Sequence, residues 1–196
     1  MDRLQPITPE QQDPEQHALY ASITGGPRAA GPQHFSLTTA DGGLSGPFNA
    51  FLLSPGVGAA LDRLGAAVRY ETALSGRTRE LAILAVAADR DSGFEWQAHE
   101  GAGRAAGLTD AEIEVVRAGG VPDLPDRAEQ SAAHLVSALL RGDVTDEEWA
   151  RWGEPLGPSA VFELTTLVGY YSLLALQMRV FRVPLPPGAG DPWGPG

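Results

Sequence analysis

The pattern of apolar and polar residues along the chain predicts a series of helices. Ser54 stands before Pro55, which places an N-cap residue before a proline at the first helical position, and this helix should run to about Tyr70. The next segment, RTRELAILAVAADR, opens at Ser75-Gly76 and is apolar on every side at its centre. A helix without a polar face belongs in the interior, so we expect this second helix to be buried.

Capping and breaking signals predict the rest of the helices. Two capping boxes, Thr109 with Glu112 and Thr145 with Glu148, each have the spacing that begins a helix. Only residues 34–39 alternate in the manner of a strand, and they do so weakly. The expected helices after the first two cover about 94–107, 110 onward, 126–141, 145 onward and 158–182. The sequence therefore predicts an all-α protein.

The two ends of the chain have a different composition. Residues 1–45 are rich in proline, glycine and polar residues, and they predict an extended N-terminal arm of turns with one helix near residues 14–23. Residues 186–196 read PPGAGDPWGPG, which cannot form a helix, and we expect this tail to be mobile. The predicted division is an arm (1–45), a helical domain (46–185) and a tail (186–196).

Composition and net charge limit the classes of molecule that we expect the protein to bind. The chain has 196 residues, of which 43% are hydrophobic, and this suits one domain with a buried core. A formal net charge of -11 repels phosphate backbones and anionic bilayers, so we expect neither a nucleic acid nor a membrane as partner. The run 164–176 is too short for a bilayer, and residues 1–10 carry no apolar signal core, which together predict a cytoplasmic protein.

The chain contains no cysteine. Disulfides, thiolate nucleophiles and zinc–thiolate sites are therefore excluded. Any chemistry must rest on carboxylate and imidazole groups.

One helical face carries a candidate acid–base group. Ser92, Glu95 and His99 are spaced i, i+3 and i+7, and Glu95 and His99 can share a hydrogen bond four residues apart. A carboxylate beside an imidazole orients it and favours its charged form, which makes a serviceable general acid or base. Glu80 lies in the buried helix and needs a partner there, for which Arg77, Arg79 and His99 are candidates.

Each of these residues also has a plainer interpretation. A Glu and a His four residues apart are commonly a solvated pair, and Glu80 near a helix start can simply favour the helix dipole. Trp96 is expected in the core. His134 fits a buried, satisfied histidine, although it could still reach the pocket. Ser92 lies two turns from His99, too far for a direct nucleophile–base contact, and a set with one histidine predicts no metal site.

The motif R-E-L-A-I-L, then S-x-x-E-W-x-x-H-x-x-x-G-x-x-x-G, resembles the core of the carboxymuconolactone decarboxylase family, which includes the alkylhydroperoxidase D-like proteins. Here it spans Arg79–Leu84 and Ser92–Gly107, and the resemblance covers roughly residues 45–185. It implies an alkylhydroperoxidase D-like helical bundle. It also implies homo-oligomers, often trimers or hexamers, for which the apolar last helix and the segment GPFNAFLLSP (46–55) are candidate interfaces and the arm a candidate strap around a neighbouring subunit.

In the peroxidase branch of this family, two cysteines precede the histidine and a glutamate lies on the helix before. Ser92 and Glu95 stand at the two cysteine positions here, and Glu80 matches the upstream glutamate. Because both thiols are absent, peroxide reduction through a disulfide relay is excluded. The surviving set of Glu80, Glu95 and His99 resembles the decarboxylase-like side, which needs no metal or organic cofactor.

The resemblance implies a lyase that acts on a small cyclic carboxylic acid or lactone, by decarboxylation or double-bond isomerisation. We expect His99 to carry the proton, Glu95 to orient it and Glu80 to tune it, while Arg77, Arg79 or Arg179 binds a carboxylate and Trp96, Ser92 and His134 complete the pocket. Two alternatives stay open. One is an isomerase or cyclase of secondary metabolism built on the same scaffold, and the other is a non-catalytic ligand-binding member.

Overall fold

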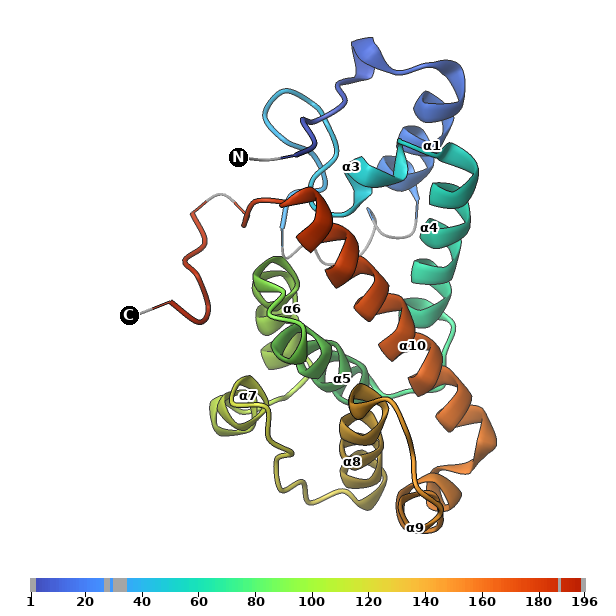
Figure 1. The fold of residues 1–196 in the computed structure, drawn as a ribbon, viewed down its shortest axis with the longest axis vertical. Coiled ribbons are helices and arrows are strands. Elements are labelled where there is room, and N and C mark those ends of the chain that lie inside the picture. Colours follow the sequence, from blue (N-terminus) through green and yellow to red (C-terminus); the bar gives the residue numbers. More distant parts are fainter. Residues whose placement is uncertain (1–2, 27–28, 30–34, 187, 195–196) are drawn as a thin grey trace.

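A computed structural model describes residues 3–26, 29, 35–186 and 188–194. Its described residues form helices and no strand, which confirms the all-α prediction (Figure 1). Within the weakly alternating stretch 34–39, His34 lies outside the described residues. Thr38 makes a single isolated bridge with Leu44 instead of a strand.

The helices match the predicted segments closely. They are α1 (Pro14–Gly25), α3 (Phe48–Phe51), α4 (Pro55–Tyr70), α5 (Gly76–Asp89), α6 (Gly93–Ala105), α7 (Asp110–Arg117), α8 (Arg127–Arg141), α9 (Asp146–Glu148) and α10 (Glu154–Phe181). A short 3₁₀ turn (Pro9–Gln11) precedes α1, and a π-helical turn (Trp149–Gly153) joins α9 to α10.

The helix ends show which signals acted as predicted. Both capping boxes form, and Ser75 accepts a hydrogen bond from the Thr78 amide. The Ser54 side chain accepts no such hydrogen bond, so Pro55 alone marks the start of α4. The last helix begins earlier than predicted, at Glu154, and Gly157 (φ 80°) interrupts it at the expected start.

The buried helix α5 is the centre of the bundle. It packs against α6, α8 and α10, and Ile83, Leu84 and Val86 are fully buried. This confirms the prediction from its uniformly apolar centre. Figure 1 shows α10 crossing the molecule from the π-helical turn to the region of the arm, so that it covers α5 on one side and meets α4 on another.

The described part of the arm folds onto its own chain. α1 lies along α4, and Leu19 and Ile23 belong to the main apolar core. Asn49 ties the start of the arm down, because its side chain accepts from the Ile7 amide and donates to the Gln5 carbonyl. The described part of the arm therefore contributes to the core of its own chain.

The segments at the two ends of the domain both contact other parts of the same chain. Phe48, Phe51 and Leu52 are buried in the chain's own core, so the 46–55 segment presents little apolar surface beyond Leu53. The tail is non-helical as predicted, but it lies against α6 and α7. Gln97 donates to the Gly190 carbonyl and Arg117 to the Pro192 carbonyl.

One helical stretch, Asp146–Phe181, is long and apolar enough to cross a membrane by length and composition alone. The sequence alone indicates an apolar run, 164–176, that is too short to span a bilayer. The helix itself is longer, because it continues on both sides of that run. Core helices of soluble proteins pass the same test. Leu164 and Leu167 on its inner face are fully buried in the core of the protein.

Candidate active site

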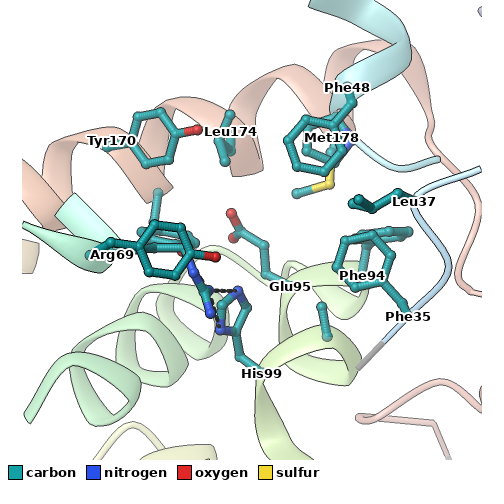
Figure 2. A pocket seen from close by; sticks show the side chains of 14 residues that line it. Phe35, Leu37, Phe48, Arg69, Phe94, Glu95, His99, Tyr170, Leu174 and Met178 are labelled. Atoms are coloured by element: carbon teal, nitrogen blue, oxygen red, sulfur yellow. Dashed lines mark hydrogen bonds between the residues drawn. The ribbon is translucent and has the colours of Figure 1, made fainter. Parts of the chain in front are cut away.

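A pocket lies among α4, α6, α10 and the loop that precedes α3 (Figure 2). Aromatic and aliphatic side chains make up most of its wall. Its polar members are an arginine, a glutamate, a histidine and tyrosines. The lining residues are Phe35, Leu37, Pro47, Phe48, Arg69, Tyr70, Phe94, Glu95, Ala98, His99, Tyr170, Tyr171, Leu174 and Met178.

His99 is paired with Glu80, and not with Glu95 as predicted. Its Nδ1 lies 2.7 Å from Glu80 Oε2, across the contact between α5 and α6. Gly103, one turn beyond His99, makes this contact close, since a Cβ there would stand 3.1 Å from Leu84. The partner of the imidazole is therefore set by helix packing and not by the i, i+4 spacing along α6.

Arg69, from the last turn of α4, completes this cluster. Its Nη1 lies 3.4 Å from His99 Nε2 and donates to the Tyr171 hydroxyl at 3.3 Å, and its Nη2 lies 3.8 Å from Glu80 Oε1. Burial opposes the charge of Arg69, but Tyr171 and Glu80 raise its pKa above the ordinary value. The guanidinium is thus a permanent positive charge on the pocket wall.

The same contacts define the state of Glu80 and His99. Burial alone would raise the pKa of Glu80, but the His99 hydrogen bond and the charges of Arg69 and Arg79 lower it. An ionised Glu80 can only accept, so Nδ1 of His99 carries the proton between them. Arg69 Nη1 lies almost equally far from the two ring nitrogens of His99, at 3.4 Å from Nε2 and 3.5 Å from Nδ1.

Glu95 stands apart from this charged cluster. It is 3% exposed, and neither carboxyl oxygen has a hydrogen-bond partner of ordinary geometry among the described residues. Burial raises the pKa of Glu95 to about 8, and the nearby Ser92 hydroxyl offsets this only in part. At neutral pH the side chain is therefore a neutral acid. Figure 2 shows it pointing into the middle of the pocket.

The rest of the wall is apolar and aromatic. The Tyr171 ring meets the His99 ring edge-on at 5.3 Å, which holds the imidazole on one side. Phe48, Leu174 and Met178 cover the opposite side of Glu95 (Figure 2). Such a wall excludes water and strengthens the electrostatic interactions inside it.

Two predicted pocket residues on α6 do not line the pocket. Ser92 is buried at the N-cap of α6 beside Glu95, but it is absent from the wall. Trp96 is fully buried in a second apolar cluster, where Arg117 lies 4.7 Å from its ring and Trp193 packs on it. Its plainer interpretation as a core residue is confirmed.

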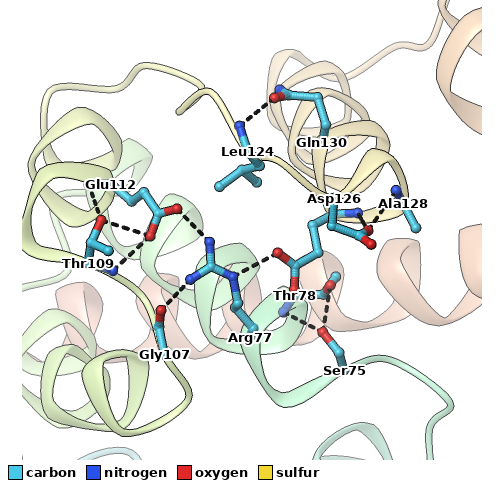
Figure 3. Close-up of polar contacts among 11 residues, drawn as sticks. Ser75, Arg77, Thr78, Gly107, Thr109, Glu112, Leu124, Asp126, Ala128 and Gln130 are labelled. Atoms are coloured by element: carbon cyan, nitrogen blue, oxygen red, sulfur yellow. Dashed lines mark hydrogen bonds and ion pairs between the residues drawn. The ribbon is translucent and has the colours of Figure 1, made fainter.

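The predicted carboxylate-binding arginines have other partners. Arg77 joins α5 to α7 and α8 through Glu112 and Glu129 (Figure 3), outside the pocket. Arg79 Nε lies 3.5 Å from Glu80 Oε1, but Arg79 is not among the residues that line the pocket. Arg179 donates to the Arg90 carbonyl.

His134 is also outside the pocket. Its ring stacks on Trp152 at 4.1 Å, and burial together with the charge of Arg151 lowers its pKa. Its plainer interpretation, a packed histidine, agrees with these contacts. Among the described residues, no group of three or more His, Asp or Glu side chains is arranged to hold a metal ion.

Sequence reasoning overlooked Arg69 and Tyr171, which the structure places beside His99. In the sequence, each of these two residues carried only a weak indication of a role in the site. Arg69 follows the buried Val68 in the last turn of an amphipathic helix, and Tyr171 is a polar-tipped aromatic within the apolar run of α10. Neither position becomes informative until α4, α6 and α10 are brought together.

Comparison with known proteins agrees with this architecture. The model of the carboxymuconolactone decarboxylase family matches residues 55–138, which confirms the resemblance seen in the sequence. Comparison with curated protein sequences gave no match to this chain.

Two solved structures share the fold. One is a protein of unknown function from Agrobacterium tumefaciens, named as a candidate antioxidant defence protein AhpD. It has a TM-score of 0.62 and 18% identity, over 70% of this chain and 96% of the other. The second is the debrominase Bmp8, with a cysteine replaced by alanine and 2,3,4-tribromopyrrole bound. It has a TM-score of 0.70 and 8% identity, over 95% of each chain.

Proposed function

Because residues 55–138 match the model of the carboxymuconolactone decarboxylase family, we propose that the chain is a cofactor-free acid–base lyase. Its substrate is a small cyclic carboxylic acid or lactone, and its reaction is a decarboxylation. The absence of cysteine in the chain rules out a thiol peroxidase.

The observation that carries the proposal is the separation of two kinds of group in one apolar pocket. Glu95 is a buried neutral acid without a hydrogen-bond partner of ordinary geometry among the described residues. Across from it, Arg69 presents a fixed positive charge that His99, Glu80 and Tyr171 hold in place. Titratable groups whose surroundings drive their pKa values apart are typical of acid–base sites.

The roles follow from these states. Arg69 binds the substrate carboxylate and balances the negative charge as it moves into the ring. Glu95 is the proton donor, since it already carries a proton at neutral pH and points into the pocket. His99 is assigned as a positioning residue for Arg69, a role that differs from the proton carrier expected from the sequence, and Glu80 holds His99 in its tautomer.

In the proposed step, the bond between the ring carbon and the carboxylate carbon of a β,γ-unsaturated lactone acid breaks. Its electron pair enters the ring as a dienolate, and carbon dioxide leaves. The proton of Glu95 then passes to the γ-carbon of the dienolate, and the ionised Glu95 regains a proton from water. Isomerisation of a ring double bond would need, in addition, a base to remove a ring proton before Glu95 delivers one.

The test is a panel of small lactone and cyclic carboxylic acids incubated with the protein in D2O. Released carbon dioxide reports decarboxylation, and one deuterium at the new C–H position reports protonation of the dienolate. We expect Glu95→Gln to abolish turnover while substrate still binds, because the amide cannot deliver a proton. We expect Arg69→Met to weaken binding, and Glu147→Gln, at an exposed position, to serve as the matched control.

The outcomes separate the open alternatives. Deuterium in the product without carbon dioxide indicates an isomerase. Panel acids that bind through Arg69 but are never converted indicate a non-catalytic ligand-binding protein and contradict the proposal. Turnover that persists in Glu95→Gln removes Glu95 from the reaction and contradicts it equally.

A further inference from the structure

A second cavity adjoins the candidate active-site pocket, which we now call the inner pocket. The second cavity lies between the loop 35–46 and residues 183–186, which follow α10. Its volume is about 250 Å³, whereas that of the inner pocket is about 60 Å³. The two cavities share Phe35 and Phe94 as a common wall. We call the second cavity the outer cavity.

The inner pocket is small for a ligand site. Pockets that hold small molecules usually measure roughly 300–1,000 Å³. The inner pocket alone, at about 60 Å³, accommodates little more than an acidic head group, while the two cavities together approach the lower end of that range. A substrate of ordinary size therefore needs the outer cavity as well.

None of the described residues that line the outer cavity carries a charged side chain. Leu4, Leu44 and Leu185 are among its apolar members. Two of its polar side chains are occupied within the arm: Asn49 by Ile7 and Gln5, and Thr39 by Asp41 and Gly43. A lining of this kind favours a neutral apolar group and disfavours a charged one.

The wall between the cavities is a pair of rings. Phe35 and Phe94 meet edge to face with centroids 5.2 Å apart. Gly46 lets the Phe94 ring lie directly against the backbone, because a Cβ there would stand 2.5 Å from the ring, and its φ of 60° also favours glycine. The loop therefore sets the position of the wall.

The charged and the aromatic walls of the inner pocket lie on different sides of Glu95. Figure 2 shows Arg69 and His99 on one side of Glu95, and Phe94, Phe35 and Leu37 on the other. A ligand whose acid group lies at Arg69 thus directs its far end towards the shared wall and the outer cavity.

We propose that the outer cavity is a second subsite that binds an apolar alkyl or aryl substituent of the substrate. The substituent crosses at the Phe35–Phe94 wall and lies among Leu4, Leu44 and Leu185. This rests on the proposed function for the position of the acid group. The substrate class is accordingly an amphipathic monoacid, and not a compact ring with several carboxylates.

The test uses 4-methylbenzoate and 4-butylbenzoate as unreactive probes, with binding measured by calorimetry. Burial of the three additional methylenes should tighten binding by at least roughly tenfold. Leu185→Glu places a charge in the outer cavity and should remove this gain while leaving 4-methylbenzoate unchanged. Val115→Glu, on the exposed face of α7, is the matched control and should keep the gain.

Thr38→Phe fills the same cavity without a charge and gives an independent check. Equal affinities of the two probes for the unaltered protein, or a gain that survives both Leu185→Glu and Thr38→Phe, would overturn the subsite. The Arg69→Met variant separates the two proposals. If the gain depends on Leu185 but 4-methylbenzoate binds equally well without Arg69, the outer subsite stands and the proposed head-group position fails.

Discussion

Replacing Glu95 with glutamine should stabilise the protein, and by an amount that grows with pH. The carboxyl is buried without a partner of ordinary geometry among the described residues, and its pKa in the folded protein is about 8, against an ordinary value of 4.5. In the unfolded chain the group ionises near its ordinary value. Between these two values, therefore, the unfolded state loses a proton that the folded state retains.

The size of the effect follows from this difference. One pKa unit corresponds to about 1.36 kcal/mol. The difference of about 3.5 units between 8 and 4.5 therefore lowers the free energy of unfolding by on the order of 5 kcal/mol, and we call this loss the penalty. The penalty is absent below pH 4.5, where the carboxyl is neutral in both states. It accumulates as the pH rises and is complete above about pH 8. Glutamine stays neutral throughout and never incurs it.

The assay is urea unfolding of both proteins at fixed concentration from pH 4.5 to 9. The difference in unfolding free energy should be small at the acid end, increase through the neutral range and level off above about pH 8. Since other groups titrate equally in both proteins, their contributions cancel. Glu147→Gln, at an exposed position, should show no such rise. A difference for Glu95→Gln that is flat across the range would refute the reasoning, because it would mean that Glu95 ionises as an ordinary carboxyl.

Three further predictions test other parts of the structure. If Glu95 is the proton donor, kcat/KM for a substrate found in the panel should fall above about pH 8 with a one-proton dependence; a kcat/KM that holds to pH 9.5 would contradict this. Gly103→Val should destabilise the protein by about 1–3 kcal/mol, since its side chain would meet Leu84 and separate α5 from α6; thermal unfolding measures this, and Gly107→Asn, where a Cβ meets nothing and asparagine tolerates the positive φ, is the mild control. We propose that the exposed apolar side chains of α10, among them Phe162 (73% exposed) and Leu176 (61%), form the interface of a trimer or hexamer; light scattering should show a smaller species for Leu176→Glu, and a monomeric unaltered protein would contradict the assembly.

The helices and most of their ends were determined by the sequence alone. Proline at the start of α4, the capping boxes of α7 and α9 and the uniformly apolar centre of α5 are local signals, and each acts within one or two turns of the chain. The absence of cysteine is likewise a property of the sequence, and it excludes thiol chemistry without any structure. The family motif located the site on α5 and α6 for the same reason, since its residues lie within one short stretch.

Only the tertiary structure decided which groups meet in the site. The spacing on α6 favours a pair of Glu95 and His99, but the close packing of α5 on α6 gives His99 to Glu80, and α4 adds Arg69 to that pair. Glu95 is left as a buried neutral acid, and for this reason we propose it as a proton donor and not as the residue that orients a base. These outcomes depend on distances between helices that are far apart in sequence. The hydrogen-bond partner and the desolvation of a side chain are set by those distances, and no local pattern records them.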